Sequence, residues 1–119
     1  MTRVFVYGTL KRGCSNHGFL TGRHFVGDAH TPGGFTLYKV TDYPAMVRSS
    51  DAGDIVAGEV WEVDDACLEQ LDRLEGIDEG LYTREPIALE APFADQPVET
   101  YIYARSIAGL KKLGSTWIE

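Results

Sequence analysis

Glu75 is the carboxylate that the sequence places best for moving a proton, at the end of a helix predicted over residues 64–75. At about 100° per residue, Glu75 projects within roughly 20° of Leu68 and inside the arc occupied by Leu71, so it faces the apolar side of that helix. Burial raises the pKa of a carboxyl group, and the negative end of a helix dipole disfavours its charged form further. Both effects suit a general acid–base near neutral pH. The alternative is that the helix frays at Gly76 and leaves Glu75 in water.

The second candidate is the segment Tyr7–Leu10, directly after an apolar, strand-like run over residues 3–7. Gly8 lets the backbone turn with its N–H groups pointing outward, and a group of such amides can bind an anion such as a carboxylate. An ordinary strand-ending turn is the alternative interpretation, because glycine after a strand is common.

The cysteines and histidines indicate no metal site. Cys14 and Cys67 form neither a metal-binding spacing nor a disulfide framework, and His17, His24 and His30 are spaced too irregularly to be ligands. Cys67 falls on the apolar side of the predicted helix, which favours burial. Cys14 is an alternative nucleophile, since it lies in a loop close to His17 in sequence.

The elements that must position these residues are mostly strands. Asp64 and Asp65 suit the start of the one strong helix, and Gly76 suits its C′ position. Short helical turns are expected near residues 15–20 and 107–110. These features predict an α+β domain: a small, mixed, β-barrel-like sheet with one main helix and short flanking helices. Strands are predicted over residues 3–7, 24–28, 35–40, 45–48, 55–63, 82–89 and 98–104.

Composition narrows the function classes. The chain has 119 residues, 44% hydrophobic and 24% charged, which predicts a single domain over residues 1–119. Its net charge is −7 and its cations are scattered, which argues against nucleic-acid binding. Its apolar stretches are too short to cross a bilayer, and the start does not read as a signal peptide, so we expect a cytoplasmic protein without a membrane role.

Several short motifs follow one another along the chain. The most specific is the opening run over residues 4–13, followed by Asn16-His17. In chain order the others are Tyr43-Pro44, Gly58-Glu59-Val60, Leu71-Asp72, Leu74-Glu75, Leu81-Tyr82-Thr83-Arg84 and Tyr101-Ile102-Tyr103. Together these motifs resemble the gamma-glutamyl cyclotransferase-like family, and within it the gamma-glutamylamine cyclotransferase branch.

The resemblance implies an enzyme that cyclises a γ-glutamyl group and releases 5-oxoproline and a free amine. It implies that Glu75 is the catalytic acid–base, and that the substrate is a small γ-glutamyl amine or peptide. It also implies that the segment containing Tyr7, Gly8, Thr9 and Leu10 grips this substrate through its backbone. The nucleophile would be the substrate's own α-amine, so we expect no metal and no organic cofactor.

Tyr82 and Tyr103 are two further residues that we expect to bind the substrate. Aromatic side chains beside strands more commonly fill the edge of a core, with the hydroxyl group reaching a polar partner. The resemblance leaves open which amine is released, and the oligomeric state.

Two other functions compete with this interpretation. One is an enzyme of the same chemistry that removes a γ-glutamyl protecting group from a biosynthetic intermediate. The other is a non-catalytic protein that binds a small carboxylate. A pure binding protein would gain little from an inward-facing Glu75, because burying a carboxylate costs desolvation free energy.

Overall fold

Strands make up most of the computed structural model, which describes residues 1–49 and 53–119. In chain order the elements are β1 (Thr2–Val6), the 3₁₀ helix η1 (His17–Leu20), β2 (His24–His30), β3 (Phe35–Lys39), β4 (Pro44–Arg48), β5 (Ala57–Val63), α1 (Asp65–Leu74), β6 (Tyr82–Pro86), β7 (Glu99–Tyr103) and β8 (Lys111–Gly114). This confirms the predicted α+β class with one main helix.

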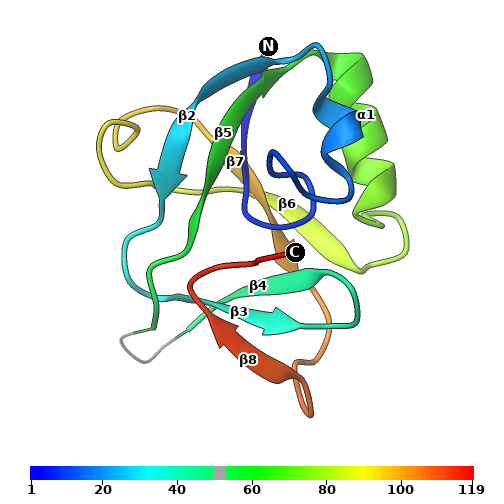
Figure 1. Ribbon diagram of the computed structural model, residues 1–119, viewed down its shortest axis with the longest axis vertical. Coiled ribbons are helices and arrows are strands. Elements are labelled where there is room, and N and C mark those ends of the chain that lie inside the picture. The colour runs from blue at the N-terminus through cyan, green and yellow to red at the C-terminus, as the bar shows by residue number, and fades with distance from the viewer. Residues whose placement is uncertain (50–52) are drawn as a thin grey trace.

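The strands form two sheets. One has five strands in the order β2-β5-β1-β7-β6, and the other has three in the order β4-β3-β8. Strand β1 is central in the larger sheet, where it runs antiparallel to β5 and parallel to β7, so this sheet is mixed as predicted. Figure 1 shows α1 beside the larger sheet and the smaller sheet beneath it, with no closed barrel among the described strands.

Strand β1 contributes to two hydrophobic cores because its side chains alternate between the two faces of the sheet. Val4 and Val6 pack in one cluster with residues of α1 such as Leu71. Phe5 and Tyr7 pack in the other cluster, which includes residues of the smaller sheet. The chain leaving β1 is therefore anchored on both faces, and it starts the Tyr7–Leu10 turn from a rigid base.

Helix α1 begins and ends where its sequence predicts. The Asp64 side chain accepts a hydrogen bond from the Cys67 N–H at 2.8 Å, which caps the first turn. At the other end Glu75 is the C-cap residue, and Gly76 has φ +65°. The Gly76 and Ile77 N–H groups donate to the carbonyls of Arg73 and Asp72, both at 3.1 Å. This is the Schellman arrangement, so the helix ends sharply and does not fray at Glu75.

Two local predictions need correction. The segment 107–110 is not a helix but a single turn, closed by a hydrogen bond from the Leu110 N–H to the Ile107 carbonyl at 3.0 Å. Strand β8 has no counterpart among the predicted strands. Its residues are exposed or half-buried, so it lacks the apolar pattern that reveals a strand, and its pairing with β3 defines it.

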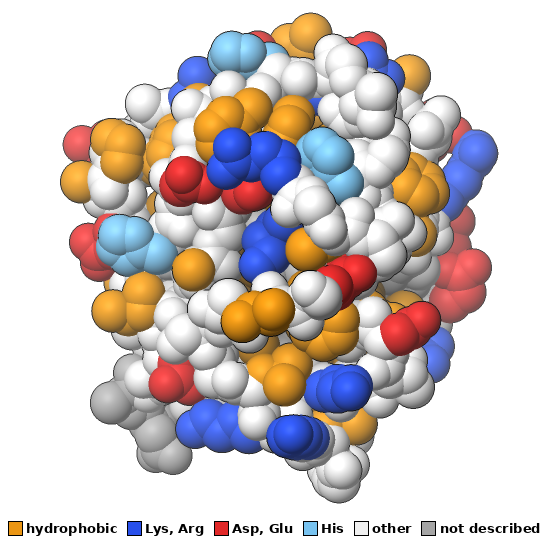
Figure 2. All heavy atoms as spheres, viewed as in Figure 1, with side chains coloured by type: hydrophobic (Ala, Val, Ile, Leu, Met, Phe, Trp, Pro, Cys, Tyr) orange, Lys and Arg blue, Asp and Glu red, His pale blue; other side chains and the backbone are white. Residues whose placement is uncertain are grey.

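The surface carries charges of both signs. Figure 2 shows acidic and basic side chains interspersed over the face in view, so the net charge of −7 is not gathered into one patch there. Within the two described ranges, no helix has the length and apolar character needed to cross a membrane.

Candidate active site

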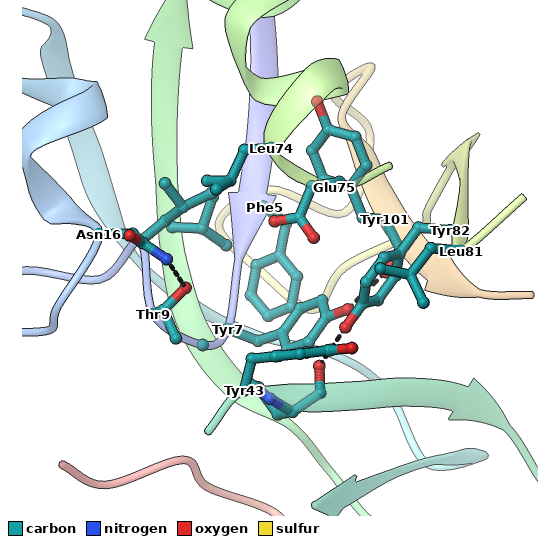
Figure 3. Close-up of a pocket in the computed structure, with 14 residues that line it drawn as sticks. Phe5, Tyr7, Thr9, Asn16, Tyr43, Leu74, Glu75, Leu81, Tyr82 and Tyr101 are labelled. Carbon is teal, nitrogen blue, oxygen red and sulfur yellow. Dashed lines mark hydrogen bonds between the residues drawn. The ribbon is translucent and has the colours of Figure 1, made fainter. Parts of the chain in front are cut away.

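A cavity lies where the turn after β1 approaches the last turn of α1 (Figure 3). The space inside it that the centre of a water-sized sphere can occupy is about 100 Å³. Its lining residues are Phe5, Val6, Tyr7, Gly8, Thr9, Leu10, Asn16, Tyr43, Pro44, Leu74, Glu75, Leu81, Tyr82 and Tyr101.

Glu75 is the one charged side chain among these lining residues. Figure 3 shows its carboxyl group leaving the end of α1 and pointing into the space between Phe5 and Tyr82, above Tyr7. Burial raises the pKa of Glu75 from its ordinary value of 4.5 to about 7. No residue within 1–49 or 53–119 donates a hydrogen bond to this carboxyl group, which leaves it free to exchange a proton with a bound molecule.

Stability should depend on pH through Glu75. The folded protein holds this proton more tightly than the unfolded chain, with a pKa of about 7 against 4.5. The stabilisation is therefore fully present below pH 4.5 and is lost as the pH rises through 7, by at most about 1.4 kcal/mol per pH unit. Urea unfolding of the parent and of Glu75→Gln at pH 5 and pH 8 checks this. The variant should gain stability relative to the parent at pH 8, and a constant difference would contradict the raised pKa.

Two tyrosines wall the cavity with their hydroxyl groups already engaged. Tyr7 Oη donates to the Tyr101 carbonyl at 2.6 Å, and Tyr82 Oη donates to the Pro44 carbonyl at 2.6 Å. Burial, together with the negative charge of Glu75, raises the pKa of both phenols well above its ordinary value. They stay neutral at physiological pH, and their protons point at backbone oxygens and not at Glu75.

Asp72 ties the last turn of α1 to the sheet beside the cavity. Its Oδ1 accepts a hydrogen bond from Tyr101 Oη at 2.8 Å, and its Oδ2 pairs with Arg84 of β6. Burial, with the neighbouring Asp72 carboxylate, raises the pKa of Tyr101, so this phenol remains a donor. Asp72 lies about one turn before Glu75, so these two contacts hold the end of the helix that carries Glu75 against β6 and β7.

The turn after β1 has its carbonyls occupied and its N–H groups free. The carbonyls of Gly8 and Thr9 accept hydrogen bonds from the N–H groups of Lys11 (3.1 Å) and Asn16 (2.8 Å). The Leu10 carbonyl contacts His17 Nδ1 at 3.0 Å, and because a carbonyl only accepts, His17 is the donor. Within the described residues, the N–H groups of Gly8, Thr9 and Leu10 donate to no other group. The three residues line the cavity, so their amides are candidate donors to an anion bound there.

Gly8 is required by a close approach and not by an unusual backbone angle. Its φ is not in the left-handed region. A Cβ atom at this position would lie 2.5 Å from Pro44 Cγ and 2.8 Å from Pro44 Cδ. The ring of Pro44 therefore packs directly on the turn, which the sequence interpretation of Gly8 as a flexible turn residue did not anticipate.

Most of the predicted site residues come together around the cavity. Glu75, the Tyr7–Leu10 turn and Tyr82 all line it. Tyr103 is not a lining residue; its ring packs edge-on against Tyr82, with the ring centroids 5.4 Å apart. Cys14 is half-buried outside the cavity, and burial, with the nearby Glu119 carboxylate, raises the pKa of its thiol. That shift disfavours the thiolate which a nucleophile needs.

Some lining residues had no predicted role. They are Phe5, Val6, Asn16, Tyr43, Pro44, Leu74, Leu81 and Tyr101. All of them fall within the motif stretches of the resemblance, which was the one available signal. Asn16 also donates from Nδ2 to Thr9 Oγ1 at 3.0 Å, so it supports the turn from the cavity side.

Several known proteins resemble this chain in sequence and in fold. A relative from Arabidopsis thaliana is 39% identical over 100 residues, and the match spans about half of that protein, 52%, and 76% of this chain. The "Gamma-glutamylcyclotransferase family protein YtfP" of Escherichia coli K12 is 32% identical over 118 residues, covering 98% of this chain and 96% of that protein.

The crystal structure of an AIG2-like protein from Mus musculus superimposes with a TM-score of 0.73 and 29% identity, over 89% of this chain and 78% of that one. The family model described as "Gamma-glutamyl cyclotransferase, AIG2-like" matches residues 4–118, a range that includes the whole cavity lining. This chain therefore belongs to the gamma-glutamyl cyclotransferase, AIG2-like family.

Proposed function

We propose that this chain cyclises the γ-glutamyl group of a small γ-glutamyl amine or peptide, releasing 5-oxoproline and a free amine without a metal or organic cofactor. The observation that carries this proposal is the facing pair in the cavity. An unpaired carboxyl group with a pKa of about 7 stands opposite a turn with free N–H groups. This pair offers one group that moves a proton and one that holds negative charge.

The reaction needs little beyond positioning and proton transfer. The substrate's α-amine attacks its own γ-carbonyl, so a C–N bond forms within the glutamyl group and the ring closes. Glu75 as a carboxylate takes the proton from the attacking nitrogen. As a carboxylic acid it returns this proton to the departing amine as the original amide C–N bond breaks. Because nucleophile and carbonyl are tethered, the cavity only has to hold the substrate folded in near-attack geometry.

The turn and the tyrosines supply that geometry. The free amides of Gly8, Thr9 and Leu10 bind either the α-carboxylate of the glutamyl group or the oxyanion that develops on the γ-carbonyl. The hydroxyl groups of Tyr7 and Tyr82 are held by backbone carbonyls, so these rings serve as rigid walls. The proposed role of Tyr103 is to support the Tyr82 ring from behind.

A panel of substrates tests this function. The purified protein, with a chelator present throughout, is incubated with γ-glutamyl alkylamides, γ-glutamyl dipeptides and ε-(γ-glutamyl)lysine. We expect 5-oxoproline and free amine in equal amounts from at least one class. Substrates that carry a biosynthetic leaving group belong in the same panel, because removal of a γ-glutamyl protecting group follows the same chemistry. The class with the highest kcat/KM identifies the leaving amine.

The matched control is the same substrate with its α-amine acetylated, which removes the nucleophile and should give no product. Release of glutamate in place of 5-oxoproline would show hydrolysis and contradict the ring closure. Binding of 5-oxoproline with no turnover of any substrate would favour the non-catalytic carboxylate-binding protein. Activity that a chelator abolishes and a divalent metal restores would contradict the cofactor-free mechanism.

A further inference from the structure

Glu59 is a buried carboxylate outside the cavity that the proposed reaction does not use. It lies on β5, opposite Val6 of β1, and is 7% exposed. Burying a carboxylate is costly unless donors surround it. The contacts of Glu59 therefore have to account for its position.

Three donors converge on this carboxylate. Oε1 accepts the Arg12 backbone N–H at 3.1 Å and Trp61 Nε1 at 3.0 Å, while Oε2 accepts Arg12 Nε at 3.0 Å. Burial alone would raise the pKa of Glu59, but these hydrogen bonds and the positive charge of Arg12 outweigh it and hold the pKa below its usual range. Glu59 is therefore a carboxylate at neutral pH, bonded to both the main chain and the side chain of Arg12.

Arg12 is held on its other sides as well. Its Nη2 pairs with Asp28 Oδ1 at 2.8 Å, and its guanidinium carbon lies 3.9 Å from the centroid of the Phe25 ring. Arg12 directly follows Lys11, whose N–H closes the turn on the Gly8 carbonyl. A fixed Arg12 thus sets where the turn ends, and β1 sets where it begins.

We propose that Glu59 is a positioning residue that aims the free N–H groups of Gly8, Thr9 and Leu10 into the cavity by holding the main chain at Arg12. The inference rests on the proposed function, because that function supplies the anion that these amides bind. Three carbonyls of the turn are bonded to residues 11, 16 and 17, which lie further along the same loop. Asp28 and Phe25 contact only the guanidinium group of Arg12, whereas Glu59 also binds its backbone N–H. The direction of the amides therefore depends on Glu59.

The test compares Glu59→Gln with Glu62→Gln, a change of the same type on the same strand. A glutamine at position 59 keeps the size of the side chain, but its NH₂ group is itself a donor. It would face one of the N–H groups that donate to the carboxylate in the parent. Glu62 pairs with Arg3 at 3.6 Å and does not line the cavity, so its change should leave the turn intact. All measurements are made where circular dichroism shows each variant folded.

We expect Glu59→Gln to weaken 5-oxoproline binding by about 10-fold or more and to lower kcat/KM by about 10- to 100-fold, because small misplacements of binding groups have effects of this size. We also expect the NMR amide resonances of Gly8, Thr9 and Leu10 to move. Glu62→Gln should change none of these quantities. A purely structural role for Glu59 would lower the melting temperature but leave affinity, kcat/KM and these resonances at parent values, and that result would overturn the proposal.

Arg12→Ala gives the answer if Glu59→Gln does not fold. This change removes the side-chain contacts of Arg12 at a half-exposed position but keeps its backbone N–H. It should lower kcat/KM at least about 3-fold and move the same three amide resonances, whereas parent values for both would overturn the proposal. The NMR comparison does not require turnover. A parent that forms no 5-oxoproline would therefore refute the proposed function and leave the positioning role to be decided by the amide resonances.

Discussion

Glu75→Gln is expected to lower the turnover number for 5-oxoproline formation by at least about 100-fold, because general acid–base groups typically contribute 10²–10⁴-fold. Glutamine keeps the shape of the side chain but cannot exchange a proton. Affinity for 5-oxoproline should change much less, since the amides of the turn remain. The fold should survive, because the variant no longer has to bury a carboxyl group whose pKa is raised by desolvation. Steady-state kinetics and calorimetry measure the two effects separately.

Glu69→Gln is the matched control on the same helix. Glu69 pairs with Arg73 at 2.6 Å on the exposed side of α1, and both side chains are mostly exposed. Its change should leave the rate nearly at the parent value, since an exposed i, i+4 pair contributes only a few tenths of a kcal/mol to stability. Near-parent turnover by Glu75→Gln, with a loss in Glu69→Gln, would contradict both the assignment of the acid–base and the orientation of the helix.

Gly8→Val is expected to abolish binding as well as catalysis, with 5-oxoproline affinity lowered by at least about 100-fold. A Cβ atom at position 8 would lie 2.5 Å from Pro44 Cγ, so either the turn or the proline ring must move. Moving the turn redirects its free amides, and moving Pro44 disturbs the carbonyl that holds the Tyr82 hydroxyl group. Calorimetry with 5-oxoproline measures the loss, and parent-like affinity would show that the turn does not bind the ligand.

Three further substitutions separate this clash from a general effect of removing a glycine. Gly18→Ala is the matched control, because a Cβ there meets no atom within 4 Å and its backbone angle is not left-handed. It should bind and turn over like the parent. Pro44→Ala removes the two ring atoms that Gly8→Ala would contact, so Gly8→Ala should cost less affinity in that background. An equal loss in both backgrounds would mean that Pro44 is not the reason for glycine at position 8.

Local features of the sequence determined the helix and the candidate acid–base. The Asp64 cap, the apolar spacing of Cys67, Leu68 and Leu71, and Gly76 at C′ each act within a few residues, so they can be read without knowing the fold. The structure agrees with them to within a residue. The inward direction of Glu75 follows from the same periodicity, and its raised pKa agrees with the expected effect of burial.

Only the tertiary structure decided what surrounds Glu75. Tyr101 lies far from the turn in sequence, yet its carbonyl accepts a hydrogen bond from the Tyr7 hydroxyl group because β7 pairs in parallel with β1. Pro44 meets Gly8 through packing of the smaller sheet against the turn, which no local pattern encodes. Glu59 falls in a predicted strand and in a motif of the resemblance, but only the pairing of β5 with β1 brings its carboxylate to Arg12. Such contacts depend on how distant segments pair and pack, and the energetic gain from them exists only once the whole chain has folded.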